Sequence, residues 1–238
     1  MKSRILIIIC VALFVTPICH AGFLDKVMKG IGVQKDKVTD EDSTVSGLKE
    51  ALSISTENAV INVSKMDGYL ANEAIMIMMP EKIRKVADVM KKVGYEKQVD
   101  DFVTSMNRAA EKAAPAAASH FTDAIKGMTF EDAKGILSGG DTAATDYFRS
   151  KTSDKLYEEF KPIVSSSMNE TGVTKSYKTM MGKYTSLPFM KEESLDLDHY
   201  VTEKLLDGLF LMIAQEEEKI RTDPAARVTD LLKKVFGK

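Results

Sequence analysis

Three polar residues interrupt a stretch that is otherwise apolar and rich in alanine. These are Asn107, Arg108 and Glu111, all within one predicted helix. Arg108 and Glu111 lie three residues apart, so they can form an ion pair on one helix face. Alternatively, the Arg108 guanidinium could bind a carboxylate or phosphate group of a ligand through two parallel hydrogen bonds. We take these three residues as binding candidates, together with Asp67 and Tyr69 from an earlier segment.

A second charged group lies near the carboxyl end of the chain. Glu217 and Arg221 are four residues apart in the order that favours an intrahelical pair, and Arg227 follows an Asp-Pro turn. All three are binding candidates. Consecutive glutamates at 216–218 diverge by about 100° around a helix, so they cannot face one cleft as a catalytic pair. We expect this group to be a charged corner that joins the last two helices.

No complete catalytic motif accompanies these residues. The sequence lacks G-x-S-x-G and H-E-x-x-H patterns. Asp196, His199 and Glu203 share one helical face, but a single histidine there is typical of a solvated surface. The glycine-rich turn before Thr145 could bind an anion, but Asp141 at the helix N-cap would repel a phosphate. We therefore assign no catalytic residue, no metal ion and no cofactor.

The first residues have the pattern of a secretory signal peptide. Lys2 and Arg4 precede an apolar run at 5–18, and the small residue Ala21 precedes Gly22. The run is shorter than the roughly 20 apolar residues that a membrane-spanning helix needs. We predict cleavage after Ala21, export to the periplasm, and no transmembrane span in the mature chain.

Charge and cysteine content exclude several classes of function. The 238 residues contain 33 Lys and Arg against 35 Asp and Glu, a net charge of −2, so we expect no nucleic-acid partner. Both cysteines, Cys10 and Cys19, lie in the predicted signal peptide. The mature chain would therefore have no disulfide, no cysteine nucleophile and no thiolate metal site.

Apolar residues recur at helical spacing along nearly the whole chain, without a convincing strand pattern. We predict an all-α fold: a single-domain multi-helix bundle over 45–238, without significant sheet. A short amphipathic helix and a polar linker, within 22–44, precede it. We expect one or two helices over 45–65, with 53–56 as a possible break between them. A helix from Pro80, a helix over 96–126 with a kink at Pro115, and a capping-box helix from Thr129 follow. The remaining expected helices are one capped by Asp141, then 156–167, 173–184, 198–221 and a last helix after Asp223-Pro224. Residues 75–79, before Pro80, are expected to be extended.

Several motifs resemble an uncharacterised family of exported bacterial proteins, catalogued only as a domain of unknown function. The resemblance covers nearly the whole mature chain from about Ser46. It implies a helical, single-domain protein of the bacterial cell envelope, without an assigned activity or cofactor. The motifs are Ala51-Leu-Ser-Ile-Ser-Thr-Glu-Asn-Ala59, Asp67-Gly-Tyr-Leu70, Ser105-Met-Asn-Arg-Ala-Ala-Glu111, Gly139-Gly-Asp-Thr-Ala-Ala-Thr145, Tyr200-Val-Thr202 and Asp223-Pro-Ala-Ala-Arg227.

The methionines are the unusual feature of the composition. The chain has 14 Met and no Trp, and thioether side chains suit irregular cores or pliable apolar surfaces. We expect a non-catalytic binding or interaction protein whose apolar inter-helix groove takes a lipid, another apolar ligand or a protein partner. The alternative is a carboxylate-dependent periplasmic hydrolase that uses Asp67, Glu111 or Glu217 with Arg108 or Arg227. A third alternative is a purely structural oligomer, although the sequence does not indicate an oligomeric state.

Overall fold

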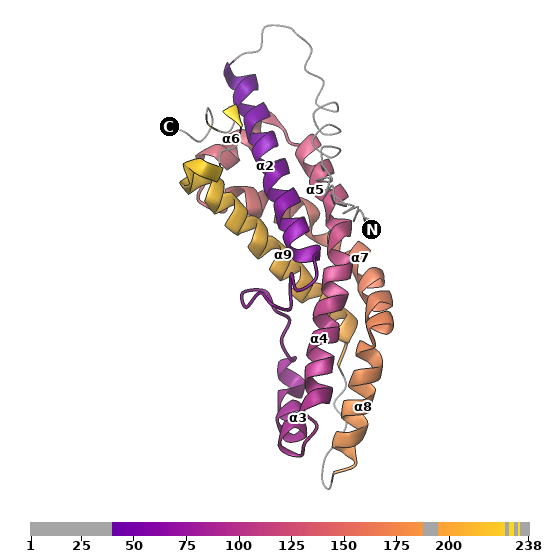
Figure 1. The fold of residues 1–238 in the computed structure, drawn as a ribbon. Coiled ribbons are helices and arrows are strands. Elements are labelled where there is room, and N and C mark those ends of the chain that lie inside the picture. Colours follow the sequence, from indigo (N-terminus) through magenta and orange to yellow (C-terminus); the bar gives the residue numbers. More distant parts are fainter. Residues whose placement is uncertain (1–39, 188–194, 227–228, 231–232, 234–238) are drawn as a thin grey trace, which may run out of the picture. The chain divides into compact units, whose positions relative to one another are not determined.

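Helices account for most of the chain in the computed structural model, which describes residues 40–187, 195–226, 229–230 and 233 (Figure 1). These residues belong to one compact unit that begins at Lys35, and no strand occurs among them. The all-α prediction is confirmed. The helices are α2 (Asp40–Ser64), α3 (Glu81–Lys92), α4 (Glu96–Ala113), η1 (Ala114–Ala116), α5 (Ala117–Lys126), α6 (Phe130–Ser138), α7 (Ala143–Thr171), α8 (Val173–Thr185), α9 (Leu197–Thr222) and η2 (Pro224–Ala226).

Some of the predicted features lie outside the described residues. They include the signal peptide, the amphipathic helix within 22–44, most of the last helix, and the binding candidate Arg227.

Helix α2 is continuous, so the possible break at 53–56 does not occur and a single helix forms. The Thr56 hydroxyl donates to the carbonyl of Leu52 at 2.8 Å, and the residue stays within the helix. Helices α5, α6 and α9 all pack against α2, and this tertiary burial outweighs the weak helix propensity of serine and threonine. The helix begins at Asp40, so its first residues replace the end of the predicted linker.

The segment that we call the connector, residues 65–80, joins α2 to α3. Ile75, Ile77 and Met79 are buried in it, whereas Met78 is exposed. This alternation is that of an extended chain. Helix α3 follows directly, with Pro80 as its N-cap, so the start of the helix is confirmed. The extended run is confirmed over 76–79, whereas Ile75 belongs to the preceding turn, in which its N–H donates to the Asn72 carbonyl at 3.1 Å.

Pro115 divides the long predicted helix as expected. Helices α4 and α5 are separated by η1, which contains this proline. The alanines of this region are buried and permit close packing with α2 and α7: Ala109, Ala110, Ala113, Ala114 and Ala117.

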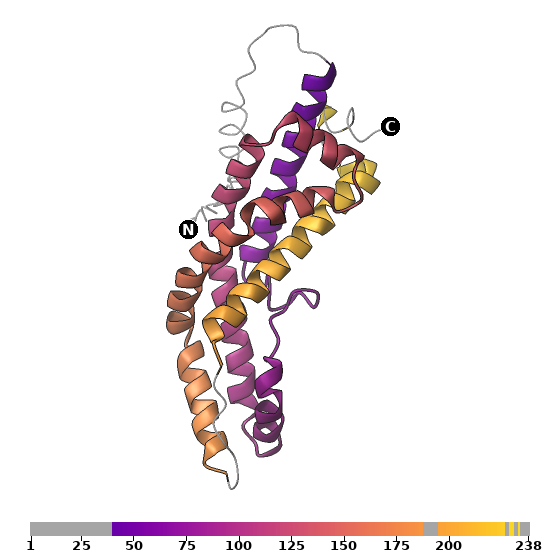
Figure 2. The same cartoon turned by 180° about the vertical axis from the view of Figure 1, so that it is seen from behind.

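Helix α7 is longer than the sequence predicts, because the expected boundary near residue 156 does not occur. The helix continues through Pro162 and ends only at Thr171, where Gly172, with a left-handed φ of 83°, is the C-cap. It packs along both α4 and α9, and the pair α7–α9 is seen side by side in Figure 2. None of the described helices is long and apolar enough to cross a membrane.

Candidate functional site

Glu111 is the centre of the first charged cluster. Only 5% of its side chain is exposed. One carboxylate oxygen, Oε1, accepts the N–H groups of Tyr69 at 3.1 Å and Leu70 at 3.2 Å. The other, Oε2, accepts Arg108 Nη1 at 2.6 Å, and Arg108 Nη2 donates to Asp67 Oδ1 at 2.6 Å. We call this set the Glu111 anchor, because it holds the start of the connector on α4.

The backbone of the connector is shaped to meet this carboxylate. Asp67 has a positive φ of 65°. A Cβ on Gly68 would lie 2.5 Å from the carbonyl oxygen of Asn62, so only glycine fits there. The tight turn brings the next two N–H groups to Glu111.

The Arg108 guanidinium is hydrogen-bonded to two carboxylates of the protein, those of Glu111 and Asp67. Its hydrogen bonds to Glu111 and then to Asp67 raise its pKa above the ordinary value. The predicted intrahelical pair with Glu111 is therefore confirmed. A ligand anion would have to displace one of these partners, although 28% of the Arg108 side chain is exposed.

Tyr69 wedges the connector against α9. Its ring is fully buried, and its hydroxyl donates to the carbonyl of Leu205 at 2.6 Å. Burial raises the pKa of Tyr69. A Cβ on Gly208 would lie 2.7 Å from the ring, so this glycine permits the contact. Tyr69 is therefore inaccessible to a ligand.

Asn107 holds the extended part of the connector. Its Oδ1 accepts the N–H of Ile77 at 2.8 Å, and its Nδ2 donates to the carbonyl of Ile77 at 2.9 Å. The side-chain amide thus pairs with this residue as a neighbouring strand would. Five of the sequence candidates therefore come together, and their contacts attach the connector to α4 and α9. They are Asp67, Tyr69, Asn107, Arg108 and Glu111.

Glu217 forms a separate cluster at the start of α7. Its Oε1 accepts the N–H of Ala144 at 2.9 Å, and its Oε2 accepts both the N–H and the hydroxyl of Thr145, at 2.9 and 2.8 Å. These N–H groups belong to the first turn of α7, where a carboxylate is favoured. The predicted cap by Asp141 is wrong: the N-cap is Thr142, which makes no side-chain cap bond.

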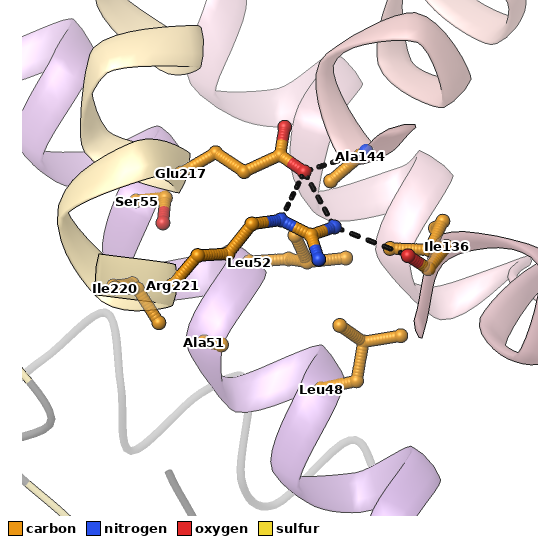
Figure 3. Close-up of a pocket in the computed structure, with 9 residues that line it drawn as sticks. All are labelled: Leu48, Ala51, Leu52, Ser55, Ile136, Ala144, Glu217, Ile220 and Arg221. Carbon is orange, nitrogen blue, oxygen red and sulfur yellow. Dashed lines mark hydrogen bonds and ion pairs between the residues drawn. The ribbon is translucent and has the colours of Figure 1, made fainter. Parts of the chain in front are cut away.

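Arg221 completes this cluster, which we call the Glu217 anchor (Figure 3). Its Nε and Nη2 donate to Glu217 Oε1 at 3.0 and 2.8 Å, so the predicted intrahelical pair is confirmed. Nη2 also donates to the carbonyl of Ile136 at 3.1 Å. The pair therefore ties α9 to α6 and α7, rather than to a following helix as the sequence suggested.

The cavity beside the Glu217 anchor is small. Its volume is about 10 Å³, which is room for about one water molecule. The lining is mostly apolar, as Figure 3 shows: Leu48, Ala51, Leu52, Ser55, Ile136, Ala144, Glu217, Ile220 and Arg221. The second charged group thus faces a void too small for an organic substrate.

A larger depression, about 290 Å³, lies between the connector and α9. We call it the edge groove. Met78 is 56% exposed and Leu211 is 40% exposed, and the Tyr200 hydroxyl donates to the carbonyl of Met78 at 3.0 Å. Lys204 and Asp207 form an ion pair at 3.1 Å. The lining residues are Ala74, Ile75, Met76, Met78, Tyr200, Lys204, Asp207, Gly208 and Leu211.

The sequence candidates did not include the residues of the edge groove. One signal was present: Tyr200, Lys204, Asp207 and Leu211 recur at helical spacing on one face of α9. This face is only partly apolar, so the sequence does not indicate that the connector lies opposite it.

Residues 38–237 match the model of the family described as "Protein of unknown function (DUF4197)". The comparisons with curated proteins and with solved structures give no match.

Proposed function

The chain belongs to the DUF4197 family, whose description assigns no activity, and we propose that it is a non-catalytic binding protein. Its binding site in this proposal is the edge groove, which takes the apolar part of a partner. The observation that carries the proposal is the pair Met78 and Leu211, two large apolar side chains left exposed on a groove of about 290 Å³.

The state of the charged residues supports a non-catalytic role. A hydrolase of the alternative type needs a carboxylate that is free to transfer a proton to or from a substrate. Both oxygens of Glu111 and both oxygens of Glu217 accept hydrogen bonds from protein groups. The two carboxylates also belong to different anchors and share no partner among the described residues. No specific observation favours the hydrolase over the binding protein.

We also propose that the protein is exported and acts in the periplasm, on the evidence of the signal-peptide pattern before Gly22. Amino-terminal sequencing of the protein recovered from a periplasmic extract tests this. We expect the sequence to begin at Gly22, whereas recovery of the intact chain in the cytoplasm would contradict export.

Titration with the uncharged, apolar dye Nile red tests the binding proposal. The wild-type chain should enhance the dye fluorescence, and Met78→Lys and Leu211→Lys should each weaken dye binding about tenfold by placing a charge in the groove. Val93→Lys is the matched control, because Val93 is 47% exposed but does not line the groove. Equal effects of all three substitutions, or no binding by the wild type, would contradict the proposal.

A further inference from the structure

We propose that the edge groove takes an extended polypeptide segment, which pairs with the connector as an added β-strand. This inference rests on the proposed binding function and names the partner class. The guest segment would run along residues 76–78 and place apolar side chains against α9.

The first argument is the orientation of the connector backbone. In an extended chain, consecutive residues direct their N–H and C=O groups to opposite edges. Asn107 satisfies both groups of Ile77 on the edge that faces α4. The groups of Met76 and Met78 therefore lie on the other edge, toward the groove that these residues line with α9.

The second argument is that this edge is only half occupied. Met76 N–H donates to the carbonyl of Asn72 at 2.8 Å, and the Met78 carbonyl accepts the Tyr200 hydroxyl. Among the described residues, the Met76 carbonyl and the Met78 N–H have no hydrogen-bond partner. A neighbouring β-strand uses such a pair of groups. It donates an N–H to the carbonyl of one residue and accepts the N–H of the residue two positions later.

The third argument is the shape of the groove beside this edge. Gly208 lines the groove, and because a Cβ there would meet Tyr69 and Ile75, this glycine lets the connector lie close against α9. Met76, Met78 and Leu211 supply apolar contacts next to the unpaired groups. Methionine adapts to differently shaped apolar partners, which suits the recognition of a peptide by its backbone.

The charge of the groove favours a peptide over an anionic lipid. Lys204 and Asp207 are bonded to each other, so the groove contains one charge of each sign. A lipid phosphate or a fatty-acid carboxylate would meet no excess of positive charge. An uncharged peptide backbone complements both this balance and the unpaired groups of the edge.

The test uses an eight-residue peptide of alternating valine and threonine with a lysine at each end, and the same peptide N-methylated at its central residues. Binding to the protein without its signal peptide is measured by calorimetry, and amide exchange at Met78 by NMR. The unmodified peptide should bind and should slow exchange of the Met78 N–H at least tenfold. N-methylation should weaken binding roughly threefold to tenfold, because it removes the donor to the Met76 carbonyl.

The variant Met78→Pro tests the same edge from the protein side. Met78 N–H has no partner within the described protein, so its removal costs no internal hydrogen bond, and the preceding residue is already extended as proline requires. Met78→Pro should weaken peptide binding about tenfold relative to the control Met78→Leu, with unchanged circular dichroism. If Met78→Pro does not fold, the N-methylated peptide and the Met78 exchange rate still decide the question.

Three results would overturn the strand proposal. Equal binding of the two peptides would show that the backbone edge is not used. Binding of dodecanoate or Nile red at the groove, with no protection of the Met78 N–H by the peptide, would leave the proposed binding function intact and exclude strand addition. If no probe binds, both proposals fail together.

Discussion

The two anchors and the edge groove differ in residue type and in exposure. The anchors bury charged side chains, whereas the groove exposes apolar ones. Glu111 and Glu217 are each about 5% exposed on their side chains, and their oxygens are occupied by backbone N–H groups and an arginine. In the edge groove, Met78 and Leu211 are among the most exposed large apolar side chains described. The charged residues of the anchors hold helices in place, whereas Met78 and Leu211 of the edge groove face solvent. The carboxylates that the hydrolase alternative would use are thus hydrogen-bonded to groups of the protein itself.

The two anchors also differ from each other. Arg221 is 15% exposed and donates to a main-chain carbonyl as well as to Glu217, so nothing in the solvent can replace its partners easily. Arg108 is 28% exposed and its second partner, Asp67, is 52% exposed. The Glu111 anchor should therefore contribute less to stability than the Glu217 anchor. Its loss should loosen mainly the connector.

The largest effect is expected for Glu217→Ala. The substitution removes the carboxylate that pairs with the mostly buried Arg221 guanidinium and that accepts the N–H groups of Ala144 and Thr145, so we expect a loss of about 3–5 kcal/mol in the free energy of unfolding. Urea denaturation followed by circular dichroism measures it. Glu218→Ala, at an exposed neighbouring position, is the control and should change the free energy by less than about 0.5 kcal/mol.

Glu111→Ala should have the second largest effect. It removes the acceptor of the Tyr69 and Leu70 N–H groups, but Arg108 keeps Asp67 and reaches solvent, so we expect a loss of about 2–3 kcal/mol. Amide exchange should rise at Tyr69 and Leu70 while the first turn of α7 stays protected. A loss larger than that of Glu217→Ala would contradict the ranking of the two anchors.

These predictions rest on contacts that the sequence discloses only in part. Local signals located the start of α3 after Pro80, the interruption at Pro115 and the capping box at Thr129, where the Thr129 hydroxyl accepts the Asp132 N–H. The pairs Arg108–Glu111 and Glu217–Arg221 also followed from spacing. In each case the partners lie within one turn of helix, so their distance in sequence fixes their distance in space.

The remaining features depend on contacts between distant residues. The cap of α7 comes from Glu217, 73 residues after Ala144, and no local pattern identifies it over Asp141. The edge groove joins Met78 to Tyr200, 122 residues away. Sequence spacing predicts a helical face and an extended segment separately, but it does not predict that they lie opposite each other.

Asp67→Asn should have a small effect. It removes an ion pair in which the aspartate is half exposed, and asparagine tolerates the positive φ at this position, so we expect a change of less than about 1 kcal/mol. Chemical denaturation at low and high salt measures it, and added salt should diminish the difference from wild type. A loss comparable to that of Glu111→Ala would show that Asp67 holds the connector more strongly than its exposure indicates.

The smallest effect concerns pH and the hydroxyl of Tyr200. Burial raises the pKa of Tyr200 above its ordinary value of 10.0, so its neutral form is favoured in the folded state. The corresponding stability is fully present below about pH 10 and is lost as the pH rises through the raised pKa. The melting temperature is measured as a function of alkaline pH. The part of the alkaline destabilisation that ionisation of Tyr200 causes should be absent in Tyr200→Phe. An unchanged alkaline profile would contradict this assignment.

The most direct test of the contrast between anchors and groove compares Leu211→Lys with Arg108→Gln in one binding experiment. Both are titrated with Nile red at a temperature where circular dichroism finds them folded. We predict that Leu211→Lys binds the dye about tenfold more weakly than wild type, whereas Arg108→Gln, although less stable, binds it as wild type does. If Leu211→Lys retains dye binding and Arg108→Gln loses it, the account is contradicted and the binding site lies at the Glu111 anchor.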